Sequence, residues 1–191
     1  MSIWSMIFLG LFIATLAYGM VIYNNLVNLK HNVSKSLANI DILLKQRHDA
    51  LPKLIDTCKA YMKYEQETFD KIIQARGLVA SAQAQKNIPQ LGQAESSLRV
   101  GLGNLFALAE NYPDLKANNS FAQLQQTIIH LENTIADRRE VYNESVNLNN
   151  ARIEQFPDVI IAKKFGFKPF YLLKFAKEEL VDVRISAGFN T

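Results

Sequence analysis

Charged residues are absent from residues 2–25, where the sequence is SIWSMIFLGLFIATLAYGMVIYNN. As a helix, the stretch from Ile3 to Ile22 would span about 30 Å, the thickness of the hydrocarbon core of a bilayer. A secretory signal peptide has basic residues before its apolar stretch and small residues at its cleavage site. No Lys or Arg precedes this stretch, and apolar residues continue through the small-x-small sequence Ala17-Tyr18-Gly19. We therefore predict that residues 1–23 form a retained transmembrane anchor.

Basic residues are missing on the N-terminal side of this anchor, so positive charge flanks it on one side only. The first basic residues after it are Lys30, Lys35, Lys45 and Arg47. Because positively charged flanks stay in the cytoplasm, the rest of the chain is expected to be cytoplasmic, with a very short N-terminus outside. Trp4 and Tyr23 lie near the two ends of the anchor, where interfacial aromatic residues are common.

Cysteine is present only once, at Cys58, which excludes a framework of intramolecular disulfides. The sequence contains no H-E-x-x-H, C-x-x-C, G-x-S-x-G or E-x-x-H motif, so it gives no support to a zinc-peptidase, serine-hydrolase or di-iron site. A net charge of +3 without a basic stripe gives no indication of a nucleic-acid partner. We predict no enzyme activity, no metal, no cofactor and no small-molecule substrate.

Apolar residues recur every three or four positions in four stretches, which is typical of amphipathic helices. These stretches are Leu26–Leu44, Leu51–Ile72, Leu91–Ala109 and Phe121–Ile153. The first begins directly after the apolar run, so the anchor and this helix are expected to be continuous. Four such helices with short connections predict an all-α fold, with an antiparallel four-helix bundle over residues 24–156.

The sequence RHDALPKL, residues 47–54, leaves two interpretations open. Asp49 could be an N-cap with Pro52 in the first turn of a second helix, where the missing N–H of proline has little effect. Alternatively, one helix could run through Pro52 with a kink, since proline kinks helices as well as ending them.

Three stretches together resemble the LemA family: YNNLVNLKHNVSKSLANIDILLKQRHDALPKLIDTCKAY, ENYPDLKANNSFAQLQ and LENTIADRREVYNESVNLNNARIEQFPDVIIAKKFGF. The most specific pieces are the ENYPDLKA turn and the RR-x-x-YN and FP of the last helix. The resemblance covers roughly Tyr23 to Lys168. It implies a bacterial membrane-anchored helical bundle with no established enzymatic activity. Some members resemble proteins of magnetosome membranes. After Pro169 this chain is more apolar than the acidic tails that the resemblance implies.

Polar residues at positions of the apolar stripes predict a buried polar layer. Glu65, Arg138 and Asn149 each occupy a position where an apolar residue is expected. A buried charge needs a partner, and a polar layer of this kind fixes the register of packed helices. The carboxylates that could pair with Arg138 are those of Glu65, Glu110 and Glu132. A ligand or proton site is the alternative interpretation.

Residues 157–191 are expected to form a short helix and an extended tail that combine basic and aromatic side chains. The residues that we expect to contact the membrane or a partner are Lys163, Lys164, Phe165, Phe167, Lys168, Phe170, Tyr171 and Lys174. This composition suits the interface of an anionic leaflet. The alternative is a small helix that caps the bundle. Beyond it, apolar residues alternate with polar ones over residues 181–186, a strand-like pattern.

These patterns, together with the bacterial origin that the resemblance implies, predict a non-enzymatic scaffold or interaction protein of the inner membrane. Its partners would be the bilayer, other membrane proteins and further copies of itself. The alternative is a self-assembling protein that organises or remodels the membrane, for which the basic and aromatic tail is the distinguishing feature.

Overall fold

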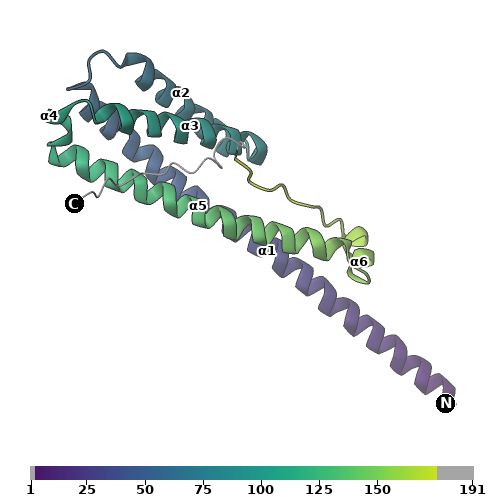
Figure 1. Ribbon diagram of the computed structural model, residues 1–191. Coiled ribbons are helices and arrows are strands. Elements are labelled where there is room, and N and C mark those ends of the chain that lie inside the picture. Colours follow the sequence, from purple (N-terminus) through teal and green to yellow (C-terminus); the bar gives the residue numbers. More distant parts are fainter. Residues whose placement is uncertain (1–2, 176–191) are drawn as a thin grey trace, which may run out of the picture. The chain divides into compact units, whose positions relative to one another are not determined.

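The computed structural model describes residues 3–175, and every regular element among them is a helix. The elements, in order, are α1 (Ile3–Lys59), α2 (Gln66–Ala84), α3 (Ile88–Ala109), α4 (Pro113–Lys116), α5 (Asn119–Glu154) and α6 (Asp158–Phe165) (Figure 1). Residues 167–175 follow without regular secondary structure. The all-helical prediction is confirmed for the described residues. The strand-like pattern over residues 181–186 lies outside them.

α1 is continuous through Pro52, so the separate helix with Asp49 as its N-cap is wrong. A proline inside a helix leaves the carbonyl four residues earlier without its helical donor. Here that carbonyl belongs to His48, and Arg76 Nε of α2 donates to it at 3.1 Å. Arg76 Nη2 also lies 2.7 Å from His48 Nε2. Arg76 therefore compensates for the missing N–H, and the helix continues to Lys59.

The interruption that we expected near Pro52 lies instead over residues 60–65, so the predicted stripe Leu51–Ile72 belongs to two helices. Side chains from the α4 region hold this connection. Tyr112 Oη donates to Glu65 Oε1 at 3.2 Å, and Asn118 Nδ2 donates to Tyr61 Oη at 3.1 Å. Met62, between them, is fully buried.

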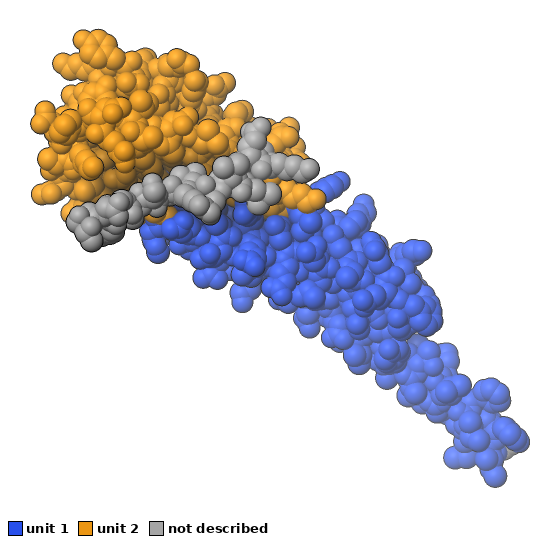
Figure 2. Space-filling view, viewed as in Figure 1, with its two compact units in different colours: residues 1–47, 130–172 blue, residues 48–129, 173–191 orange. Residues whose placement is uncertain are grey.

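The chain divides into two compact units (Figure 2). Unit 1 comprises residues 1–47 and 130–172, and unit 2 comprises residues 48–129 and 173–191. The predicted grouping of helices into one four-helix bundle involves both units and stays a prediction. So does the division into an anchor, a bundle and a C-terminal segment.

In unit 1, α1 and α5 run in opposite directions. Ser36 Oγ lies 3.2 Å from Ser145 Oγ, and Arg47 Nη1 donates to Glu132 Oε1 at 2.6 Å. Residue numbers therefore rise along α1 as they fall along α5. Buried side chains recur at spacings of three, four or seven: Leu26, Val33, Ile40, Leu44 and Arg47 on α1, and Ile135, Tyr142, Val146, Asn149 and Ile153 on α5. This spacing is typical of helices that pack along a common seam.

In unit 2, α2 and α3 form a helical hairpin around a short turn. Asn87 caps α3, because its Oδ1 accepts from Gln90 N at 3.2 Å. Farther along α3, a β-carbon at Gly101 would lie 3.2 Å from Ile72 Cγ1 of α2, so glycine permits close packing there. A β-carbon at Gly92 would collide with the carbonyl oxygen of Lys174. The extended end of the described chain therefore lies directly against α3.

Candidate membrane-interface site

The N-terminal part of α1 exposes an apolar surface. Its large side chains are more than half exposed at Trp4 (72%), Phe8 (69%) and Leu11 (66%). α1 is the single helix among residues 3–175 that is long and apolar enough to cross a membrane, with a mean hydropathy of 2.1 in its most apolar window. Only 6% of that window is buried. By length and composition, α1 is therefore a candidate membrane-spanning helix.

α6 follows α5 through Pro157 and is fixed at both ends. At its start, the carboxylate of Asp158 is buried and forms an ion pair with Arg152. At its end, Gly166 adopts a left-handed conformation with φ of 72°. Phe167 N then donates to Ala162 O at 3.0 Å, and Gly166 N donates to Lys163 O at 3.4 Å, which is a Schellman motif. This turn reverses the chain and directs Phe167 back toward α1.

An aromatic cluster attaches α6 to α1 at the end of the apolar run. The ring centroid of Tyr23 lies 4.8 Å from that of Phe165 and 5.9 Å from that of Phe167. Beneath these rings, a small apolar core joins α1, α5 and α6: Ile22, Leu26, Ile153 and Ala162. A β-carbon at Gly19 would lie 4.0 Å from Ile161 Cδ1. α6 is therefore placed beside residues 19–26 of α1, where the apolar run gives way to polar sequence.

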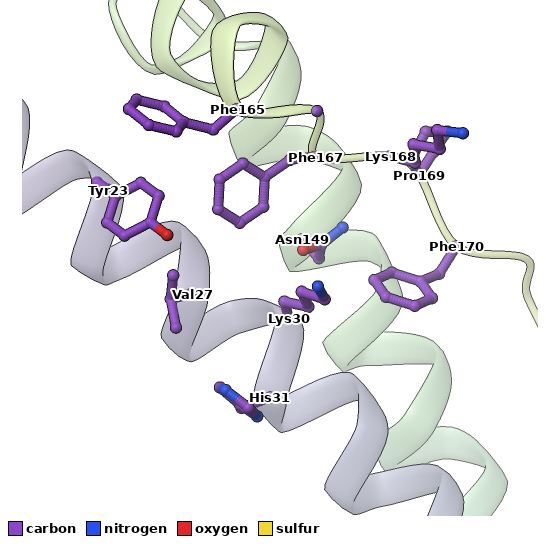
Figure 3. Close-up of a pocket in the computed structure, with 11 residues that line it drawn as sticks. Tyr23, Val27, Lys30, His31, Asn149, Phe165, Phe167, Lys168, Pro169 and Phe170 are labelled. Atoms are coloured by element: carbon purple, nitrogen blue, oxygen red, sulfur yellow. The ribbon is translucent and has the colours of Figure 1, made fainter.

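A polar pocket of about 460 Å³ lies on one side of the aromatic cluster (Figure 3). Lys30 and His31 of α1, Asn149 of α5 and Lys168 line it, together with Tyr23, Val27 and residues 165–170. Asn150 holds the outer wall in place. Its Oδ1 accepts from Phe170 N and its Nδ2 donates to Phe170 O, both at 2.9 Å. We did not single out Asn150 from the sequence.

An apolar groove of about 540 Å³ lies on the side of the apolar run. Its lining residues are Thr15, Leu16, Gly19, Met20, Tyr23, Asn24, Ile161, Lys164 and Phe165. Tyr23 and Phe165 line both the groove and the polar pocket. Neither of these two linings, both made of described residues, contains an Asp or Glu side chain.

The structure corrects the predicted polar layer. Arg138 is exposed, so its expected burial is wrong. The buried arginine is Arg47, with 1% of its surface exposed, and it pairs with Glu132 rather than leaving that carboxylate for Arg138. Glu65 is half-buried and belongs to unit 2, whereas Asn149 is buried in unit 1. Asn149 Nδ2 donates to Asn150 Oδ1 at 3.2 Å.

The C-terminal residues that we expected at a membrane or partner differ in exposure. Lys163, Lys164, Phe165, Lys168, Tyr171 and Lys174 are exposed, whereas Phe167 and Phe170 are half-buried against unit 1. For those two phenylalanines, the structure favours the capping alternative. The Tyr171 carbonyl accepts from Tyr142 Oη at 2.9 Å, and burial raises the pKa of Tyr142 to about 12.

The LemA family model matches residues 36–186 of this chain. Protein LemA of Metamycoplasma hominis is 28% identical, over 94% of this chain and 83% of its own length. Magnetosome protein MamQ 2 of Paramagnetospirillum magneticum is 24% identical, over 82% of this chain and 65% of its own length. Magnetosome protein MamQ of Magnetospirillum gryphiswaldense is 22% identical, over 86% of this chain and 68% of its own length. This chain thus spans about two thirds of the length of these magnetosome proteins.

Proposed function

The chain belongs to the LemA family, and from that premise we propose that it is a non-enzymatic scaffold protein of the bacterial inner membrane. The observation that carries the proposal is the difference between the two parts of α1. Its first part exposes an uncharged apolar surface of membrane-spanning length, and its later part buries one face in the folded chain. A soluble protein rarely exposes an apolar surface of this extent.

Membrane association agrees with the family relatives that are named as magnetosome proteins. In the proposed arrangement, residues 1–23 are the anchor, residues 24–156 form the cytoplasmic bundle, and the basic and aromatic segment that begins at residue 157 starts at the membrane side. The one-sided distribution of Lys and Arg supports this orientation, because positive flanks are retained in the cytoplasm. The continuous helix means that the anchor and the rest of unit 1 are joined without a flexible linker.

A self-assembling, membrane-organising protein is the second candidate function. Exposed apolar and basic side chains on α6 beside the anchor favour it. Ile160 and Phe165 are both 56% exposed, and the two consecutive lysines Lys163 and Lys164 directly precede Phe165. A surface of this kind suits contact with an anionic leaflet or with another protomer.

Chemical crosslinking of the full-length chain in native membranes, followed by mass spectrometry, tests the proposal. A scaffold is expected to give crosslinks to a reproducible set of other membrane proteins, absent from an unrelated single-pass protein expressed at the same level. Crosslinks only between copies of the chain would favour the self-assembling alternative. Recovery of the chain in the soluble fraction would contradict both.

A further inference from the structure

We propose that unit 1 holds one anionic phospholipid of the leaflet next to the folded part of the chain. Its phosphate would occupy the polar pocket at Lys30 and Lys168, and one acyl chain would lie in the apolar groove beside Gly19. The inference rests on the proposed function, because it requires α1 to span a bilayer. It goes further by naming the chemical class of a ligand and the residues that select it.

The order of the two cavities along α1 matches the order of chemistry across a leaflet. The groove is lined by Leu16 and Gly19, within the apolar run, and the polar pocket by Lys30, farther along the same helix. From Gly19 to Lys30 the helix rises by about 16 Å. If hydrocarbon covers residues 3–22, Lys30 lies about 12 Å beyond it. Its long side chain can reach back toward the headgroups.

The two cavities adjoin at the aromatic cluster, and in this proposal one molecule extends from one cavity into the other. Tyr23 and Phe165 line each of them. Tyrosine is suited to this place, because its ring contacts acyl chain while its hydroxyl reaches the headgroup level. A free anion would need only the polar pocket. The apolar groove, continuous with the proposed membrane span, therefore points to a lipid.

The charges around the site favour an anionic headgroup. Lys30 and Lys168 line the polar pocket and Lys164 lines the groove, and neither lining contains a carboxylate. Lysine ammonium groups form charge-assisted hydrogen bonds with phosphate oxygens. A zwitterionic lipid would bring its own ammonium group toward these lysines, which disfavours it. The site is therefore expected to discriminate by headgroup charge.

Glycine and asparagine give the site its shape. At Gly19 the groove has no side chain on α1, and a β-carbon there would lie 4.0 Å from Ile161 Cδ1 on the opposite wall. Asn150 holds Phe170 by two hydrogen bonds, so the wall of the polar pocket is fixed before any ligand binds. A preformed pocket lowers the entropic cost of binding.

Native mass spectrometry of the detergent-solubilised full-length chain tests the proposal with defined probes. Dioleoylphosphatidylglycerol and dioleoylphosphatidylcholine share their acyl chains and differ in headgroup charge. One phosphatidylglycerol is expected to remain bound at lower concentration than phosphatidylcholine. The double variant Lys30→Gln, Lys168→Gln should weaken phosphatidylglycerol binding by about tenfold or more. Lys45→Gln, an exposed lysine on the same helix, is the matched control and should change nothing.

Filling the groove separates lipid from free anion. Gly19→Leu should weaken binding of both lipids and leave the binding of inorganic phosphate unchanged. Where thermal unfolding shows that Gly19→Leu disturbs α6, Met20→Trp fills the groove from an exposed position. Inorganic phosphate that binds as tightly as phosphatidylglycerol would overturn the lipid assignment. Equal affinity for both lipids, with no effect of the lysine variants, would show that Lys30 and Lys168 do not form a binding site for an anionic headgroup.

A separate experiment, extraction of membranes with sodium carbonate, tests whether α1 anchors the chain. If sodium carbonate releases the wild-type chain from membranes, the proposed function fails. Selective lipid binding in detergent that is lost in the lysine variant would still support the binding site in that case. If the chain resists extraction but binds both lipids equally, the anchor stands and the lipid site does not.

Discussion

Arg47 and Glu132 of unit 1 form an ion pair between a buried guanidinium and a half-buried carboxylate, with an Nη1–Oε1 distance of 2.6 Å. Removing Glu132 takes a carboxylate away from the buried guanidinium of Arg47, and loss of a partner from a buried charge typically costs several kcal/mol. We expect Glu132→Ala to lower the free energy of unfolding by about 3 kcal/mol. Urea unfolding of the detergent-solubilised chain, followed by circular dichroism, measures this change.

Two further variants serve as controls for this prediction. Arg138→Ala removes an arginine that is exposed on the same helix as Glu132, and its effect should be within about 0.5 kcal/mol. The double variant Arg47→Leu, Glu132→Leu removes both charges, and it should be less destabilising than Glu132→Ala alone. A loss for Arg138→Ala as large as that for Glu132→Ala would show that the buried charge is not the cause.

The position of Arg47 could have been predicted from spacing alone. It follows Leu44 by three positions and precedes Leu51 by four, so it lies on the apolar stripe of a continuous helix. One of the two interpretations of Pro52 placed a helix boundary there, and that boundary would have divided the stripe. For Arg138 the same spacing argument fails, since the structure places the side chain on the exposed face of α5. Spacing identifies the residues that could be buried. Which of them are buried depends on the side of the helix that packs against its neighbour.

Among the elements, the continuity of α1 depends on a contact between helices. Arg76 of α2 supplies the donor that Pro52 cannot supply to the His48 carbonyl. We expect Arg76→Ala to cost about 1–2 kcal/mol, because a carbonyl then loses its partner. In a Pro52→Ala background the residue at position 52 regains an N–H, so the same Arg76→Ala change should cost less.

A double-mutant cycle over these two positions measures their coupling. Unfolding free energies of the wild type, both single variants and the double variant should give a coupling of at least about 0.5 kcal/mol. Arg99→Ala, an exposed arginine of α3, is the control and should show no coupling to Pro52→Ala. Strictly additive effects at Pro52 and Arg76 would mean that the hydrogen bond does not compensate for the proline.

Apolar periodicity predicted that these segments are helical, but it did not predict the boundary between α1 and α2. Residues 60–65, AYMKYE, contain no Gly, Pro, Asn, Asp or Ser that would signal a turn. The chain leaves the helix there while Tyr61 and Glu65 bond to Asn118 and Tyr112, residues about 50 positions later. Tertiary contacts of this kind override local propensity and leave no mark in the local sequence. The end of α6 at Gly166, by contrast, follows the ordinary rule for helix ends.

For the whole molecule, the approach of the C-terminal segment to the membrane side was predicted, but the contacts that build the candidate site were not. The apolar run and the basic and aromatic segment were each evident from composition. Their meeting at Tyr23, Phe165 and Phe167 depends on the length of α5 and on the chain reversal after α6. The ring contacts join residues more than 140 positions apart. No local pattern encodes such a contact, so the two cavities had no signal in the sequence.

The proposed span of α1 predicts two different environments for its two ends. Ser2→Cys, before the proposed hydrocarbon span, should react with a membrane-impermeant maleimide in intact spheroplasts, whereas Lys45→Cys should react only after permeabilisation. The side chain of Lys45 is exposed in the structure, so folding alone does not protect that position. The native thiol gives little background, because Cys58 is buried and burial raises its pKa to about 12, which leaves almost no thiolate at neutral pH.

Substitution of arginine for apolar residues of the apolar run tests the proposed membrane span directly. Each Arg at the centre of a membrane helix costs about 2.5–3.5 kcal/mol in insertion. Leu9→Arg combined with Phe12→Arg should therefore shift the chain from the carbonate-resistant to the soluble fraction. Ile42→Arg combined with Lys45→Arg, at exposed positions beyond the proposed span, should leave it resistant. Labelling of Lys45→Cys in intact spheroplasts would show that the folded part lies outside the cytoplasm, opposite to the proposed orientation. Carbonate extraction of the unmodified chain would contradict the span itself, since hydrocarbon contact along α1 is what resists alkali.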